Sequence, residues 1–201
     1  FKNMEKEQTL IIIKPDGVQR SLIGEIIRRY ERMGLKLVAL KLVMPTKELV
    51  ERHYLSLPAW LENVGRKITK ACLAKGKKPP SDDLVECGKE VLKRNVNFLT
   101  SGPVVAMVWE GNEAAGIVKK ITGPTEPLSS DFGTIRGDLT VDSYGLAEDG
   151  VRAVRNLIHV SGTPEEAQKE IPVWFSPKEI LKYRLIQERI LYDVNLDGIK
   201  E

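Results

Sequence analysis

Apolar and polar residues follow two different periods in the first part of the chain. Residues 9–14 form a short run rich in β-branched side chains that ends at a Pro-Asp-Gly turn signal, which predicts a strand with Lys14 at its end. In residues 22–33 apolar positions recur at helical spacing until Gly34 stops the pattern. Residues 35–43 then alternate as a strand does. The predicted order is therefore strand, helix, strand.

The same order returns in the second half of the chain. The pattern predicts a buried strand at residues 104–109, a helix at residues 112–121 and a short strand at residues 156–160. Thr163 and Pro164 suit the cap and the first position of a further helix. Two such units are typical of a ferredoxin-like βαββαβ fold, an α+β class whose antiparallel sheet carries helices on one face.

A segment of different character separates the two units. After a predicted helix at residues 46–54, residues 61–97 contain a break rich in Lys, Gly and Pro at residues 75–80, with apolar positions at helical spacing on both sides. This pattern favours two helices packed as a hairpin. We therefore expect one domain over residues 1–201, with an insertion at residues 61–97.

Composition and charge limit the class of protein. The chain has 201 residues, of which 42% are hydrophobic, and this is enough for one buried core. A net charge of +3 does not demand a polyanionic partner, so nucleic acid is not expected as one. No apolar run approaches the roughly 20 residues that span a bilayer, and residues 1–8 lack the apolar segment of a secretory signal. We expect a cytoplasmic protein without a membrane anchor.

Several motifs of other enzyme classes are absent from the sequence. It contains no P-loop, dinucleotide-binding, zincin, hydrolase or protein-kinase signature. Residues 193–198 match the opening of an EF-hand loop, but the sequence does not reach the position of its final glutamate, so a polar tail is the simpler interpretation. Cys72 and Cys87 lack C-x-x-C spacing and are expected to be free thiols. The sequence thus predicts no metal site built by the protein.

His159 is one of two histidines and stands between a predicted strand and a predicted helix. Judged by position alone, a histidine at such a place is more often structural than catalytic. An imidazole attacks phosphorus through a nitrogen with a free lone pair, so its other nitrogen must carry the proton and meet an acceptor. Glu170 offers that acceptor, and Ser161 could hold the same carboxylate. These neighbours make His159 a candidate nucleophile.

Phosphoryl transfer also requires cations and hydrogen-bond donors around the phosphate oxygens. Groups of the right types occur at Lys14, Tyr54, Thr125, Arg136 and Asn156. The chain therefore contains the chemical parts of a phosphotransferase, spread over distant segments.

Four sequence blocks point to a known family. They are TLIIIKPDGVQR at residues 9–20, SGPVVAM at residues 101–107, GTIRGD at residues 133–138 and NLIHVS at residues 156–161. In this order they resemble the signature blocks of nucleoside diphosphate kinases, which move the terminal phosphate of a nucleoside triphosphate onto a nucleoside diphosphate by a ping-pong reaction. The resemblance covers most of the chain outside the insertion and an extra stretch before the last block.

The resemblance implies a role for each catalytic candidate. His159 would be the phosphorylated nucleophile, and Glu170 would orient its ring. Lys14 and Tyr54 would lie beside the transferred phosphate, with Tyr54 in the family's His-Tyr pair. His53, the other member of that pair, would be a helix residue without a catalytic role.

The resemblance also implies how the substrate is held. Arg136, Thr125 and a cation on the preceding helix would bind the polyphosphate, and Asn156 would contact the sugar. Lys119 stands where the family usually has an arginine; a lysine keeps the charge but loses the bidentate fork, and a solvated surface lysine is the alternative. Trp60 lies near the family's base-stacking phenylalanine, and a plain core residue is the alternative.

Two residues beside the nucleophile depart from the family. Val160 and Gly162 stand where a glycine and an aspartate are usual, and Thr163 could take over the capping of the next helix. Mg²⁺ would arrive with the nucleotide phosphates. The family's habit of forming hexamers or tetramers implies a homo-oligomer here. The insertion could alter that assembly, form a lid or add stability.

Two other functions fit a ferredoxin-like sheet. A module that binds nucleotides or single-stranded nucleic acid would show aromatic and basic residues interleaved on an exposed strand, and residues 35–43 contain no aromatic residue. A catalytically weakened relative would be expected to lose some of its active-site residues, yet His159, Glu170, Lys14 and Arg136 are all present. The sequence therefore favours the kinase.

Overall fold

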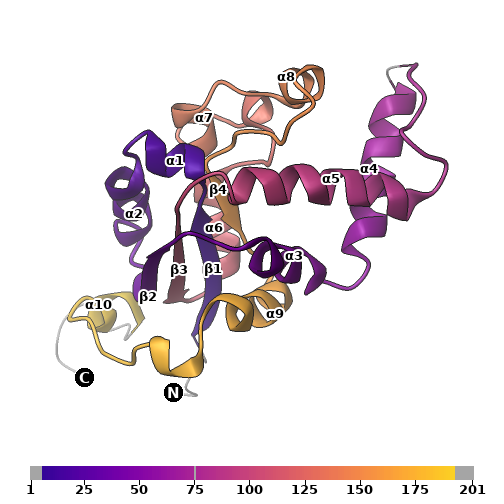
Figure 1. Cartoon of the computed structure of the whole chain (residues 1–201). Coiled ribbons are helices and arrows are strands. Elements are labelled where there is room, and N and C mark those ends of the chain that lie inside the picture. Colours follow the sequence, from indigo (N-terminus) through magenta and orange to yellow (C-terminus); the bar gives the residue numbers. More distant parts are fainter. Residues whose placement is uncertain (1–5, 75, 193–201) are drawn as a thin grey trace.

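The computed structural model describes residues 6–74 and 76–192 (Figure 1). Its strands are β1 (Glu7–Ile13), β2 (Lys36–Val43), β3 (Val104–Gly111) and β4 (Ile158–Val160). The two crossover helices are α2 (Ile23–Glu31) and α6 (Ala114–Thr122). The predicted βαββαβ order and the α+β class are confirmed. The EF-hand-like residues 193–198 lie outside the described residues.

The four strands form one antiparallel sheet in the order β2-β3-β1-β4. β1 lies at the centre and pairs with β3 along its whole length, while β4 adds a short edge in which His159 lies opposite Ile12. β2 forms the other edge, and its register with β3 shifts between Leu37 and Ala39. This topology places the end of β1 beside the start of β4. Lys14 and His159 therefore lie in the same region of the sheet.

Helices α2 and α6 cover one face of the sheet, as the helical spacing of their apolar residues predicted. Ile26 and Tyr30 of α2 and Val118 of α6 pack with Ile11 and Ile13 of β1 in one buried cluster. The Tyr30 hydroxyl lies 2.7 Å from the Thr122 hydroxyl, so this buried polar group is satisfied at the end of α6. This layer of helices supports one face of the sheet beneath β1.

The second face of the sheet is covered as well, by α9 (Pro164–Trp174). Ala167, Ile171 and Trp174 pack against Leu10 and Ile12, the β1 residues that point away from α2. Because both faces are buried, β1 and β3 are nearly continuous apolar runs rather than alternating ones. α9 therefore adds a helical layer to the predicted single-sided arrangement, and it carries Glu170.

The insertion is a helical hairpin, as predicted, made by α4 (Trp60–Ala74) and α5 (Leu84–Leu99), and it projects from the body of the protein (Figure 1). The two backbones touch: a Cβ added at Gly65 would lie 1.9 Å from the Leu84 carbonyl oxygen, and one at Gly88 would lie 2.1 Å from that of Leu61. The end of α5 packs with α3 (Lys47–Leu55) in a third cluster. This cluster adjoins the active site.

Several short elements complete the fold. They are α1 (Pro15–Gln19), η1 (Pro127–Ser129), α7 (Ile135–Leu139), α8 (Tyr144–Asp149), η2 (Pro177–Glu179) and α10 (Glu188–Tyr192). α1 occupies the predicted Pro-Asp-Gly turn, with Lys14 as its N-cap residue. Thr163 caps α9 through the Glu166 N–H, and Pro164 follows it, both as predicted.

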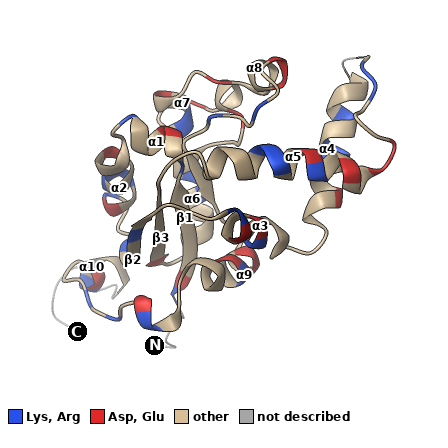
Figure 2. Ribbon diagram, in the orientation of Figure 1, with Lys and Arg blue, Asp and Glu red and all other residues tan. Residues whose placement is uncertain are grey.

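Charged residues of both signs are interspersed along the helices (Figure 2). Cys72 and Cys87 are buried free thiols, which confirms that prediction. Within residues 6–74 and 76–192, none of the helices has both the length and the apolar character needed to span a bilayer.

Candidate active site

His159 presents its ring at the edge of the sheet, where its side chain is 19% exposed. Its Nε2 atom lies 3.1 Å from the Oε2 atom of Glu170. Since a carboxylate accepts hydrogen bonds, this contact assigns the imidazole proton to Nε2 and leaves a lone pair on Nδ1. In the part of the chain that the structure describes, Nδ1 has no hydrogen-bond partner.

Glu170 is a buried carboxylate that the fold holds from two sides. Besides His159, the Ser161 hydroxyl donates to the same Oε2 atom over 2.5 Å. Burial opposes ionisation, but the charge and hydrogen bond of His159, together with His53 and Ser161, outweigh it and hold the pKa of Glu170 well below its usual range. The predicted grouping of His159, Glu170 and Ser161 is present in the structure.

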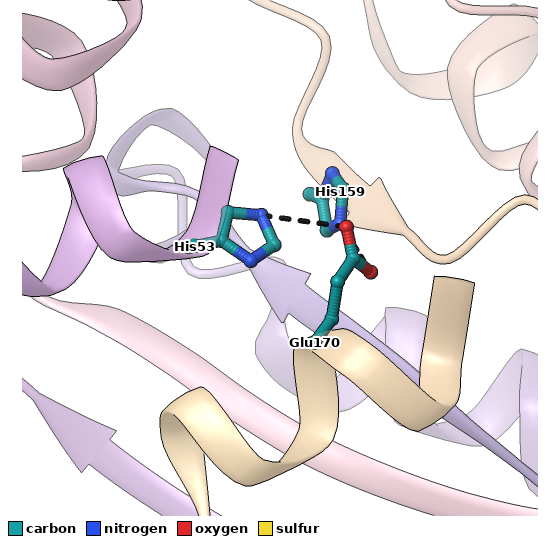
Figure 3. Close-up of side chains that lie close together, drawn as sticks. All are labelled: His53, His159 and Glu170. Carbon is teal, nitrogen blue, oxygen red and sulfur yellow. Dashed lines mark hydrogen bonds and ion pairs between the residues drawn. The ribbon is translucent and has the colours of Figure 1, made fainter. Parts of the chain in front are cut away.

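His53 completes this group, although the sequence interpretation gave it no catalytic role. It belongs to α3, is fully buried and meets the His159 ring edge-on, with 4.4 Å between ring centroids (Figure 3). Its Nε2 atom lies 3.9 Å from Oε1 of Glu170. Helical spacing alone could not reveal this, because the apolar neighbours of His53 only indicate a buried helix face. We call His53, His159, Ser161 and Glu170 the imidazole cluster.

Three of these residues also have the donor types of a metal site. The ligand atoms of His53, His159 and Glu170 all lie within 4.8 Å of one another, and no other such group of His, Cys, Asp and Glu occurs among the described residues. A cation bound to Nε2 of His159 would replace its proton and its bond to Glu170. Because the neutral ring would then carry its proton on Nδ1, we do not assign a metal here.

A second group surrounds the ends of β1 and β4. The Lys14 ammonium donates to the Asn156 Oδ1 atom over 2.7 Å, and the Asn156 amide donates to the Thr125 carbonyl over 2.7 Å. Burial and the nearby charge of Arg136 lower the pKa of Lys14 to about 7, against a smaller opposing effect of Asp16. We call Lys14, Thr125, Arg136 and Asn156 the phosphate cluster.

Arg136 holds the backbone of this cluster together. Its guanidinium donates to the carbonyl oxygens of Gly123, Pro124, Asn156 and Ile158 at 2.5 to 3.1 Å. Burial lowers the pKa of Arg136 to about 10, so it remains charged at neutral pH. Four of its five N–H groups are used in this way, which leaves one for a ligand.

The backbone between the two clusters takes an unusual shape. Leu157 is fully buried and has φ of 68°, a left-handed conformation that is strained for a branched residue. Its N–H donates to Asp16 at 3.1 Å and its carbonyl accepts from the Lys14 N–H at 2.8 Å. This turn explains why β4 begins at Ile158, later than predicted, and it links Asn156 to the strand that carries His159.

Tyr54 lies beside the imidazole cluster, on the side of the hairpin. The Tyr54 ring lies 6.4 Å from that of His159, and burial is the main reason that its pKa is raised. Trp60 packs against Tyr54, with 4.8 Å between ring centroids. Trp60 therefore contacts the core cluster of α3 and α5, which fits the alternative interpretation of this residue.

Phe98, whose ring centroid is 5.9 Å from the Lys14 ammonium, also lines an open pocket of about 270 Å³. Its remaining lining residues are Arg94, Asn97, Ser101, Val151, Arg152, Ala153 and Arg155. The walls thus come from α5 and from the extra stretch that precedes Asn156. This cavity adjoins the phosphate cluster.

The remaining predicted residues lie at the margin of the site. Lys119 is exposed on α6, and its side chain has no hydrogen bond or ion pair among the described residues. Val160 is partly buried in β4. The Gly162 N–H donates to the Glu166 carboxylate over 2.7 Å, which joins the N-terminus of α9 to β4 without the usual aspartate. Neither Val160 nor Gly162 disturbs the contacts of the imidazole cluster.

An imidazole oriented by a carboxylate, beside a buried lysine and arginine, suits phosphoryl transfer, and comparisons with known proteins agree. The nucleoside diphosphate kinase family model matches residues 7–59 and 84–180. The nucleoside diphosphate kinase of Pyrobaculum aerophilum is 48% identical over 183 residues, which cover 89% of this chain and 100% of the relative. The family model passes over residues 60–83, so the stretch outside the family pattern is α4 and its loop, and α5 lies within the matched region.

Solved structures give the same result. A crystal structure of the Pyrobaculum aerophilum enzyme superimposes with a TM-score of 0.84 at 46% identity, covering 88% of this chain and 100% of the other. A transition-state mimic of the Borrelia burgdorferi enzyme, with vanadate and ADP bound, superimposes with a TM-score of 0.76 at 34% identity, covering 94% and 98%. The chain belongs to the nucleoside diphosphate kinase family and transfers phosphate between nucleotides.

Proposed function

We propose that the protein performs this transfer through a phosphohistidine on the Nδ1 atom of His159. The observation that carries the proposal is the 3.1 Å contact between His159 Nε2 and Glu170, because it leaves Nδ1 as the nitrogen with an available lone pair. The partial exposure of His159 allows a substrate to reach that atom.

The reaction proceeds in two matched steps. The Nδ1 lone pair forms a bond to the terminal phosphorus of a nucleoside triphosphate, the bond from that phosphorus to the bridging oxygen breaks, and the nucleoside diphosphate leaves with the bonding electrons. A second nucleoside diphosphate then attacks the phosphohistidine through a terminal phosphate oxygen, and the N–P bond breaks. The proton stays on Nε2 of His159 and remains hydrogen-bonded to Glu170 throughout. The carboxylate therefore stabilises the positive charge that develops on the ring.

The phosphate cluster supplies the charge that the transferred group requires. In this proposal Lys14 and Tyr54 contact the transferred phosphate, Arg136, Thr125 and Lys119 bind the polyphosphate, and Asn156 binds the sugar. Mg²⁺ would arrive with the nucleotide phosphates and would neutralise part of their charge. The base stacks on Trp60, and a fluorescence titration with a nucleoside diphosphate tests this contact, because the quenching expected in the wild-type protein should be lost in Trp60→Phe.

We further propose a cytoplasmic homo-oligomer, a hexamer or a tetramer, built from one domain over residues 1–201. The nucleotides are its partners, and nucleic acid is not. The support for this assembly is membership of the family, and sedimentation of the purified chain tests it.

Transfer of label from a nucleoside triphosphate marked at its terminal phosphate tests the proposed function. We expect the protein to acquire an acid-labile, base-stable label that moves onto added nucleoside diphosphate, and His159→Ala to acquire none. His53→Gln is the matched control, because it removes the other histidine and keeps the nucleophile. A wild-type protein that takes up no label would refute the proposal.

A further inference from the structure

His53 is a buried polar side chain whose surroundings are not explained by packing alone. It is fully buried, and neither ring nitrogen has a hydrogen-bond partner among the described residues. An imidazole that loses its water without gaining a partner destabilises the folded state. A buried imidazole without a hydrogen-bond partner therefore indicates a function, and the residues around His53 indicate which one.

The ring of His53 is fixed by aromatic neighbours on several sides. Its centroid lies 4.9 Å from that of Tyr54 and 5.8 Å from that of Trp174, and it meets His159 edge-on at 4.4 Å. These contacts come from α3, α9 and β4, so His53 has little freedom to turn away from Glu170. Its position is determined by three separate elements.

The two oxygens of Glu170 are used unequally. Oε2 accepts hydrogen bonds from both His159 and Ser161, whereas Oε1 faces the Nε2 atom of His53 at 3.9 Å (Figure 3). This distance is too long for a hydrogen bond, but catalytic hydrogen bonds are often long in a site without substrate and shorten during the reaction. A small movement of α3 or α9 would close the gap.

The charge state of His53 suits a donor to this carboxylate. Burial and the neighbouring His159 lower the pKa of His53 to about 3, so its ring is neutral and carries one proton. The charged and titratable groups around the pair are His159 on β4, Lys14 at the end of β1 and Tyr54 on α3. Of the two ring nitrogens, Nε2 is the one that faces a carboxylate oxygen.

We propose that His53 is a positioning residue that donates its Nε2 proton to Oε1 of Glu170 when His159 is phosphorylated. This inference rests on the proposed function of His159. With donors on both oxygens, the carboxylate cannot rotate, and Oε2 stays in line with the N–H of His159. His53 thereby keeps the proton on Nε2 of His159 and the lone pair on Nδ1.

Two substitutions of His53 separate a donor from a packing residue. His53→Phe keeps an aromatic ring against His159, Tyr54 and Trp174 but removes the N–H, whereas His53→Gln places an amide N–H near the position of Nε2 and loses the ring. We expect His53→Phe to slow formation of the phosphohistidine about tenfold with little change in nucleotide KM, and His53→Gln to retain most of the rate. A packing role predicts the reverse order and would overturn the proposal.

The acid limb of the pH–rate profile gives a readout that packing does not move. Loss of a donor to Glu170 raises the pKa of that carboxyl, so the acid limb of His53→Phe should shift to higher pH. Trp174→Phe is the matched control, because the Trp174 ring also packs against His53 but its N–H has no hydrogen-bond partner among the described residues. It should lower stability without shifting the limb. An unshifted limb in His53→Phe counts against the proposal.

A measurement on the wild-type protein avoids any dependence on folding of the variants. The chain contains only two histidines, so ¹⁵N labelling of histidine yields two sets of ring signals. We expect His53 to be the Nε2–H tautomer, with a slowly exchanging proton that moves downfield in the phosphorylated protein. If His53 is instead the Nδ1–H tautomer, the proposal for His53 is overturned. A wild-type protein that takes up no phosphate label would instead overturn the proposed function of His159.

Discussion

The imidazole cluster and the phosphate cluster lie next to each other but are organised differently. In the imidazole cluster, buried groups already face one another, with a carboxylate held by His159 and Ser161. In the phosphate cluster, Arg136 uses its donors on backbone carbonyls, and burial lowers the pKa of Lys14 to about 7. In the proposed mechanism, His159 is therefore oriented before the substrate binds, whereas Lys14 gains its full positive charge only when it binds the phosphates.

The largest effect is expected in the imidazole cluster. Glu170→Gln should lower kcat by roughly 10² to 10³-fold with little change in nucleotide KM, because the amide no longer stabilises the positive ring or secures its tautomer. Steady-state kinetics measure both constants. Glu166→Gln is the control on the same helix, since the Glu166 carboxylate accepts from the Gly162 N–H and the Glu166 N–H donates to the Thr163 hydroxyl, with no hydrogen bond to the imidazole cluster. If Glu170→Gln mainly raised the nucleotide KM, Glu170 would act in substrate binding instead.

A smaller effect, on stability, is expected in the phosphate cluster. Arg136→Met removes a buried cation from four carbonyl oxygens and should lower the free energy of unfolding by about 3 kcal/mol. Urea denaturation measures this change. Arg29→Met is the comparison, because Arg29 is only partly buried, contacts Glu25, Gly133 and Asp138, and should contribute about 1 kcal/mol or less. Equal losses in the two variants would argue against a structural role for Arg136.

The smallest effect concerns pH. The pKa of Lys14 is lowered to about 7 in the free protein, and bound phosphates favour the ammonium, so nucleotide binding above pH 7 should take up about one proton. Affinity should then fall by up to about tenfold for each pH unit above 7. Calorimetry in two buffers of different ionisation enthalpy counts the proton. If Lys14→Met retains the same proton uptake, Lys14 is not its source.

Much of the fold followed from local patterns because its main elements are long and strongly periodic. The strands, the crossover helices and the hairpin occur where alternation or helical spacing predicted them, within a few residues. The short helices α7 and α8 have too few residues to show a period, and they were not predicted. β4 is shorter than predicted because Leu157 adopts a left-handed conformation, which its amino-acid type does not favour.

Some contacts of the candidate site could be predicted from the sequence and others could not, for similar reasons. His159, Glu170 and Ser161 lie close together in the sequence, so a strand followed by a helix was enough to predict their meeting. The resemblance left two interpretations for Trp60, base stacking and core packing, and in the structure its ring packs on that of Tyr54. The roles of Lys119 and Asn156 toward nucleotide remain predictions.

The amino-acid sequence by itself determined the chemical types of the site, the strand and helix periods, and the order of the elements, because these depend on residues that are near one another in the chain. Only the tertiary structure decided that His53 faces Glu170 and that Arg136 binds carbonyl oxygens. Those contacts depend on which side of each helix meets the sheet, and on which distant backbone lies there. Because α3 and α9 both contribute to the cluster around Leu10 and Ile12 of β1, His53 of α3 meets the His159 ring there.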